Sequence, residues 1–179
     1  MDSNSALQLI ILILLLVLSG FFSSAETALS TVNRVRMRSL EEEGNKRAAR
    51  VNKILDNYSK MISTILIGNN IVNLSASSLS TMLATKMATQ LGAGANAATF
   101  VGLATGILTI LILIFGEITP KSAATINAEK MALGDVVIVY WLTRVLTPVI
   151  FVINHLSYGV MRLMGINPNA QAKTMTENE

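Results

Sequence analysis

Three stretches of the sequence are long and apolar enough to suggest passage through a lipid bilayer. They run from about residue 6 to 32, from 61 to 85 and from 97 to 119. A bilayer core about 30 Å thick needs roughly 20 mostly apolar residues per helix. Because a helix satisfies its own backbone hydrogen bonds in lipid, the pattern predicts an all-α membrane protein with three transmembrane helices. The composition agrees, since 51% of the 179 residues are hydrophobic and 14% are charged.

Basic residues are concentrated in the loop after the first apolar stretch. Eight of the 14 lysines and arginines lie between Arg34 and Lys60. Loops rich in lysine and arginine stay in the cytoplasm, so we expect this loop to be cytoplasmic and the N-terminus to be outside. Three spans place the C-terminal part in the cytoplasm. A cleaved signal peptide begins with basic residues, and no basic residue precedes the first stretch. We therefore expect this stretch to remain in the mature protein, which we expect to be an integral plasma-membrane protein.

A fourth apolar stretch, residues 131–164, is interrupted by charge. Its longest segment without an ionisable residue, 145–154, is too short to cross a bilayer. Pro148 would bend any helix there. The pattern therefore favours an amphipathic juxtamembrane helix lying along the cytoplasmic interface, although a fourth span stays open. The ionisable residues that divide the stretch are Asp135, Arg144, His155 and Arg162.

The third stretch ends in the segment FGEITPK, where a carboxylate and a proline stand at membrane depth. Pro120 has no N–H to donate to the carbonyl of Gly116, and its ring kinks a helix. An unsatisfied carbonyl in hydrocarbon is costly, so it should find a donor or a cation. The carboxylate of Glu117 lies beside it, and this combination suits a hard cation. The alternative is a simple proline kink in which Glu117 pairs with Lys121.

The first stretch carries polar residues on one helical face. Ser19, Ser23, Glu26 and Ser30 are spaced at i, i+4, i+7 and i+11. Hydroxyl groups on one face of a membrane helix can bind an ion or a neighbouring helix. Glu26 lies close to the cytoplasmic end, and we expect it to be a structural or gate residue that pairs with Arg34 or with another span. We assign Lys121 to the same class.

The second stretch contains the segment IGNNIVN. Asn69 and Asn73 are four residues apart, and Ser77 continues their row. Two carboxamides on one stripe of a membrane helix are costly unless they meet each other, another helix or an ion. Asn70 lies about 100° away from this stripe, so we expect it to be a packing or capping residue.

The three stretches together could bring six oxygen ligands to one point. Six oxygens with one formal negative charge suit Mg²⁺ or Na⁺ and disfavour soft metals. The sequence has no cysteine and one histidine, which excludes thiolate and multi-histidine sites. Alternatively, the serines and asparagines only join the helices by hydrogen bonds. The six predicted ligands are the side chains of Ser19, Ser23, Asn69, Asn73 and Glu117 and the carbonyl of Gly116.

Three motifs in this order resemble one known family. SGFFSSAETALS, IGNNIVN and FGEITPK are similar to motifs in the transmembrane domain of the CorC/CNNM (cyclin M) magnesium transporters, also called the DUF21 domain. The resemblance covers nearly the whole chain. It implies a homodimer with three spans per protomer and a belt-like juxtamembrane helix, which exports Mg²⁺ in exchange for Na⁺. It also assigns cation binding to the six residues above, with Pro120 supplying a kink.

The sequence differs from this family at its C-terminal end. Members of the family continue into CBS domains that bind ATP with Mg²⁺, whereas this sequence stops at Glu179. We therefore divide it into a DUF21-like membrane domain, residues 1–166, and a polar linker, residues 167–179, toward CBS domains that this chain lacks. Gly102 and Gly106 form a small-xxx-small pair on the third stretch, which suits either a dimer contact or a contact within the chain.

These features lead to two functional hypotheses. The first is a Mg²⁺ transporter that works by alternating access, with the Pro120 kink as a moving part and Na⁺ as the coupling ion. The second is a membrane-embedded Mg²⁺ sensor or scaffold that carries no flux. An enzyme is disfavoured because Asp135 and His155 form no recognisable catalytic set. As partners we expect membrane lipid and a second copy of the chain, and no nucleic acid.

Overall fold

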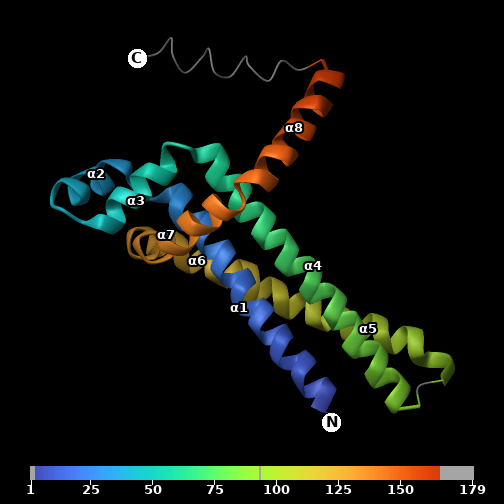
Figure 1. The fold of residues 1–179 in the computed structure, drawn as a ribbon. Coiled ribbons are helices and arrows are strands. Elements are labelled where there is room, and N and C mark those ends of the chain that lie inside the picture. The colour runs from blue at the N-terminus through green and yellow to red at the C-terminus, as the bar shows by residue number, and fades with distance from the viewer. Residues whose placement is uncertain (1–2, 93, 166–179) are drawn as a thin grey trace.

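The computed structural model describes residues 3–92 and 94–165, and these residues form helices joined by short turns (Figure 1). The predicted all-helical fold is confirmed for this part of the chain, and the predicted linker, residues 167–179, lies outside it. In chain order the elements are α1 (Ser3–Thr31), α2 (Arg34–Glu42), α3 (Lys46–Leu55), α4 (Tyr58–Gln90), η1 (Gly94–Asn96), α5 (Ala97–Ile112), η2 (Leu113–Ile118), α6 (Thr119–Ile126), α7 (Ala128–Val145) and α8 (Thr147–Leu163).

Two helices of the described residues are each long and apolar enough to cross a membrane. One is Ser5–Thr31, within α1, and the other is Ala97–Ile126, which continues through α5, η2 and α6. The pair α7 and α8 meets the same requirements only if the two bent helices count as one span. The first and third predicted spans therefore coincide with helices that could cross a bilayer.

The second predicted span, residues 61–85, lies within α4, but α4 is not among the helices that meet both requirements. Its 33 residues give it a length of about 50 Å, so length is not the limit. Its asparagines, serines and threonines lower its hydropathy, and they include Asn69 and Asn73. α4 nevertheless lies alongside both α1 and α5 (Figure 1). The predicted ligands themselves thus weaken the apolar signal of this helix.

The larger hydrophobic core lies at one end of the bundle, where α2, α3 and α7 pack around the last turns of α1 and the first turns of α4 (Figure 1). Two asparagines cap the short helices there. Asn33 Oδ1 accepts from the Arg36 N–H at 3.1 Å, and Asn45 Oδ1 accepts from the Arg47 N–H at 2.9 Å. The apolar residues buried in this core include Met37, Ala48, Val51, Ile65 and Val136.

The prediction of a single juxtamembrane helix over residues 131–164 is wrong. The segment forms two helices whose axes differ by 69°. Pro148 stands in the first turn of α8, a position that tolerates proline because its N–H would have no helical partner. A helix that continued from α7 through this residue would lose a hydrogen bond and clash with the proline ring, so the chain turns instead.

The two halves of this segment have different environments. α7 is packed into the core, where Ala132, Val136 and Val139 are fully buried. It therefore does not simply lie on the surface as an amphipathic helix would. α8 points away from the bundle (Figure 1), and Ile150 is its one buried residue among those described. Its many exposed apolar side chains are suited to contact with lipid or with another surface.

Gly68 of α4 allows α1 and α4 to approach closely, and its replacement tests this packing. A Cβ at this position would lie 2.5 Å from the ring of Phe22. That ring is buried and packs edge-to-face on Phe21. We predict that Gly68→Ala lowers the free energy of unfolding by about 1–3 kcal/mol, as measured by chemical unfolding in detergent.

Gly134→Ala in α7 is the matched control for this substitution. Nothing lies within 4 Å of a Cβ added there, and alanine favours a helix over glycine. We expect this control to keep or raise the stability of the protein. An equal loss of stability in both variants would contradict the packing argument.

Candidate functional site

Four of the six predicted ligands form one hydrogen-bonded set between α1, α4 and η2. Ser19 Oγ donates to Asn73 Oδ1 at 2.7 Å and lies 3.3 Å from the Gly116 carbonyl oxygen. Asn73 Nδ2 donates to Glu117 Oε1 at 3.0 Å. A serine hydroxyl has one proton, so it can serve only one of its two acceptors at a time. The structure thus brings Ser19, Asn73, Gly116 and Glu117 together, with one acceptor always left without this donor.

The other two predicted ligands are buried and have no hydrogen-bond partner in the described part of the chain. They are Ser23 Oγ and Asn69 Oδ1. Each lies four residues from a member of the hydrogen-bonded set, Ser23 from Ser19 and Asn69 from Asn73, and therefore about one helical turn away. An unsatisfied buried oxygen costs about 1–3 kcal/mol. These two oxygens are free to bind a cation.

The Gly116 carbonyl belongs to η2, a π-helical segment. At its end the Thr119 N–H bonds to the carbonyl of Ile114, five residues earlier rather than four. Pro120 follows directly and has no N–H to donate. The chain thus meets the proline with a widened turn, and Ala97–Ile126 remains one helix. Widened turns of this kind are frequent at functional sites, and this one leaves the Gly116 carbonyl facing Ser19.

Two glycines permit the close approach of α1 to this turn. A Cβ added to Gly116 would lie 2.8 Å from Ser19 Oγ and 3.2 Å from Ser19 Cβ. On the facing helix, a Cβ added to Gly20 would lie 3.3 Å from the Pro120 ring. A larger side chain at position 116 would push Ser19 out of the hydrogen-bonded set. Gly20 was not among the predicted residues, although it lies in the motif SGFF.

An ion pair joins the first and third spans beside the site. Lys121 Nζ lies 3.2 Å from Glu26 Oε2. The predicted alternative, in which Lys121 neutralises Glu117, is therefore not what the structure contains. In the described residues the hydrogen-bond partner of Glu117 is the amide of Asn73, and no basic side chain forms an ion pair with it. The Glu117 carboxylate is thus available to a cation.

Besides Asp135 Oδ2 of α7, three further polar atoms of the described residues are buried without a hydrogen-bond partner, and sequence reasoning missed all three. They are Gln8 Oε1, Ser80 Oγ and Thr105 Oγ1. Gln8 and Thr105 each lie about 16 Å along their helices from the site. Because α4 runs opposite to α1 and α5 (Figure 1), all three lie toward the N-terminal end of α1. Ser80 could have been found by continuing the row of Asn73 to i+7, whereas the other two are solitary.

The candidate site has few charged or nitrogen-containing metal ligands, and most of its possible ligands are neutral oxygen atoms. In residues 3–92 and 94–165 no group of three or more histidine, cysteine, aspartate or glutamate side chains could hold a metal ion. A cation at this position would therefore be bound by one carboxylate together with hydroxyl, amide and carbonyl oxygens. Such a set suits a hard cation rather than a transition metal.

Comparison with known proteins gives one family match and several relatives. The chain matches the family model of the cyclin M transmembrane N-terminal domain over residues 9–179. It is 36% identical over 170 residues to a UPF0053 protein of Haemophilus influenzae. It is 37% identical over 149 residues to the UPF0053 inner membrane protein YfjD of Escherichia coli. It is also 36% identical over 172 residues to a DUF21 domain-containing chloroplast protein of Arabidopsis thaliana.

These alignments cover most of this chain but a smaller part of each relative. The covered shares of this chain are 95%, 83% and 96%, in the same order. The covered shares of the relatives are 39%, 33% and 25%. The chain therefore spans between a quarter and two fifths of the length of these curated relatives.

Two serines of α1, Ser19 and Ser23, allow the role of the unsatisfied Ser23 oxygen to be tested by measurements of stability. We predict that Ser23→Ala keeps or raises the free energy of unfolding in ion-free detergent, because it removes a buried oxygen that has no partner. Ser19→Ala is the control and should lower that free energy by about 0.6 kcal/mol, the average for hydrogen bonds between membrane helices. Chemical unfolding measures both. A larger loss for Ser23→Ala than for Ser19→Ala would show that Ser23 does have a partner.

Proposed function

Because this chain belongs to the cyclin M transmembrane-domain family, we propose that it transports Mg²⁺ across the membrane through the site between α1, α4 and η2. The observation that carries the proposal is the pair of buried oxygens, Ser23 Oγ and Asn69 Oδ1, that have no partner in the described residues. They lie one helical turn from the hydrogen-bonded set that contains Glu117. Mg²⁺ prefers oxygen ligands and keeps several of its waters, so it need not contact all six.

The hydrogen bonds of the site would be exchanged for ion contacts when Mg²⁺ binds. Ser19 donates to Asn73 and Asn73 donates to Glu117, so these groups now satisfy one another. A cation would take the oxygens as ligands, and the Ser19 proton would have to turn away from it. The hydrogen-bonded site and the ion-bound site thus favour different spacings of the three helices. Mg²⁺ would therefore bind one arrangement of the helices more tightly than the other, and this difference in affinity is what couples ion binding to a conformational change.

The widened turn of η2 supplies a place for that change. Alternating access requires one part of a helix bundle to move relative to another around a fixed site. η2 and Pro120 lie between α5 and α6 in the third span, and the Gly116 carbonyl lies within the turn itself. A movement of α6 relative to α5 would therefore open or close the site on one side. The Glu26–Lys121 ion pair lies on that side and would act as a gate.

Na⁺ is the proposed coupling ion, with Mg²⁺ moving outward. Moving a doubly charged ion outward against a negative-inside potential costs about 4.6 kcal/mol per 100 mV. An inward Na⁺ gradient can supply this energy. Na⁺ can use the same class of oxygen ligands, and the single carboxylate of Glu117 would neutralise it. The two ions would then compete for one site.

The proposed arrangement in the membrane follows from charge and length. The basic helices α2 and α3 face the cytoplasm by the positive-inside rule, α4 serves as the second of three spans, and the N-terminus lies outside. The working unit is a homodimer in the plasma membrane. Pairing of two copies would place a second polar surface beside α4, which explains how a helix of moderate hydropathy is accommodated in lipid.

Binding of Mg²⁺ should be visible as a gain in stability. For wild-type protein in detergent, Mg²⁺ at 100 times its Kd should raise the free energy of unfolding by about 2.7 kcal/mol. Asn69→Ala removes a proposed ligand and should reduce this gain. Asn70→Ala is the matched control, since Asn70 is exposed and lies on another face. Equal gains in both variants would remove Asn69 from the ligand set.

Transport should be measured as Mg²⁺ flux in proteoliposomes with and without an opposing Na⁺ gradient. We expect wild-type flux to depend on Na⁺, Glu117→Gln and Asn73→Ala to abolish it, and Asn70→Ala to retain it. Both losses follow from removal of groups in the hydrogen-bonded set. If the wild-type protein binds Mg²⁺ but moves none under any gradient, the sensor or scaffold hypothesis replaces transport.

A further inference from the structure

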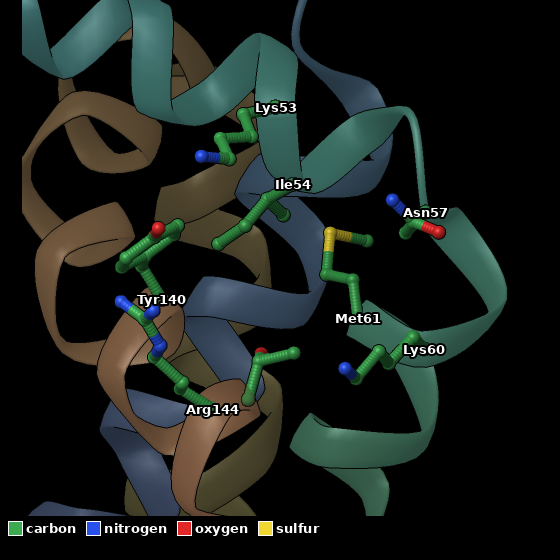
Figure 2. A pocket seen from close by; sticks show the side chains of 8 residues that line it. Lys53, Ile54, Asn57, Lys60, Met61, Tyr140 and Arg144 are labelled. Carbon is green, nitrogen blue, oxygen red and sulfur yellow. The ribbon is translucent and has the colours of Figure 1, made fainter. Parts of the chain in front are cut away.

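A pocket of about 310 Å³ lies at the basic end of the bundle, away from the cation site. It is formed by the end of α3, the first turns of α4 and the last turns of α7 (Figure 2). Its apolar side includes Ile54 and Met61, both of which are buried. None of its lining residues belongs to the six predicted ligands. The pocket therefore needs an explanation of its own.

Three positively charged side chains from three helices line this pocket. They are Lys53 of α3, Lys60 of α4 and Arg144 of α7. Figure 2 shows the amine of Lys60 directed from α4 toward α7, and the guanidinium of Arg144 close to Tyr140. Lys53 Nζ lies 5.7 Å from the centre of the Tyr140 ring, a favourable cation–π distance. The pocket thus concentrates positive charge between helices that are far apart in the sequence.

These charges have no acidic partner in the described residues. No ion pair joins Lys53, Lys60 or Arg144 to a carboxylate there, although ion pairs form elsewhere at this end of the bundle. Like charges that converge repel one another and raise the energy of the folded state. The first turn of α4 adds to the positive potential, because Asn57 does not cap its amides and helix N-termini attract anions. An anion in the pocket would relieve this repulsion, whereas Mg²⁺ would be excluded.

We propose that this pocket binds a phosphate group, supplied by the headgroup of an anionic phospholipid. Arginine and lysine are the side chains that bind phosphate best. Exposed aromatic and apolar residues adjoin the pocket in sequence, with Tyr58 45%, Trp141 59% and Val145 68% exposed. Tyrosine and tryptophan favour the membrane interface, and basic pockets between helices on the cytoplasmic side bind anionic headgroups. The choice of leaflet rests on the orientation proposed above.

The bound headgroup would join α3, α4 and α7 at the point where the chain turns into α8. Each of the three helices contributes one charge, so a single phosphate could contact all of them. Removal of these charges should weaken lipid binding without unfolding the protein, because Lys53 and Arg144 are exposed and Lys60 is half-buried. The proposal does not depend on which cation the protein carries.

The test is native mass spectrometry of this chain, delipidated, with added phosphatidylglycerol or zwitterionic phosphatidylcholine. The pocket variant is Lys60→Gln with Arg144→Gln. The control variant is Lys46→Gln with Arg47→Gln, which loses the same charge from exposed residues of α3 outside the pocket. We expect phosphatidylglycerol to bind about tenfold more weakly to the pocket variant than to wild type, and the control to match wild type.

Further experiments distinguish a lipid headgroup from soluble phosphate as the ligand and check that the variants fold. Melting in lipid-free detergent checks that both variants fold, and the single variants Lys60→Gln and Arg144→Gln serve if the double variant does not. If phosphatidylglycerol binds wild type no better than phosphatidylcholine does, and inorganic phosphate stabilises wild type more than the pocket variant, the pocket binds soluble phosphate and the lipid proposal is overturned. If pocket and control variants bind phosphatidylglycerol and inorganic phosphate equally, the proposal is overturned.

Discussion

The structure depends on the absence of water in the bilayer core, which leaves polar atoms to find partners within the protein. Most hydroxyl groups of the long helices do so locally. Thr81, Thr85 and Thr109, for example, each donate to the carbonyl four residues earlier. Ser19 instead reaches across to another helix, and Ser23 finds no partner in the described residues. Ser19 and Ser23 belong to the candidate site, whereas Ser80 and Thr105, which also lack a partner in the described residues, lie toward the N-terminal end of α1.

The division of the fold into a packed end and a loosely packed shaft follows from the same constraint. The large core gathers α2, α3 and α7 at the basic end, where water competes for polar groups and apolar burial can drive packing. Along the shaft the most apolar part of Ala97–Ile126 has no buried residue, since lipid tails can cover apolar side chains as well as protein does. Movement of this apolar part would therefore expose no buried side chain, whereas η2 and α6 of the same helix pack closely on α1.

Much of the candidate site could be predicted from the sequence, because helical periodicity places Ser19 and Ser23 on one face of the first span and Asn69 and Asn73 on one face of the second. Pro120, which has no N–H, likewise indicated that the carbonyl of Gly116 four residues earlier needs another partner. Sequence could not show that Lys121 pairs with Glu26, since that choice depends on how two spans meet in space. It could not show the basic pocket either, because Lys53 and Arg144 are brought together only by tertiary packing. Solitary polar residues such as Gln8 carry no periodic signal at all.

The bend between α7 and α8 has a mechanical consequence. α8 projects from the bundle over 17 residues, a length of about 26 Å, and among the described residues its one buried side chain, Ile150, lies near its base. A small tilt of α7 within the core would be magnified into a displacement of several ångströms at the far end of α8. The helix thus has the geometry of a lever, whose short arm lies in the protein core and whose long arm reaches beyond it.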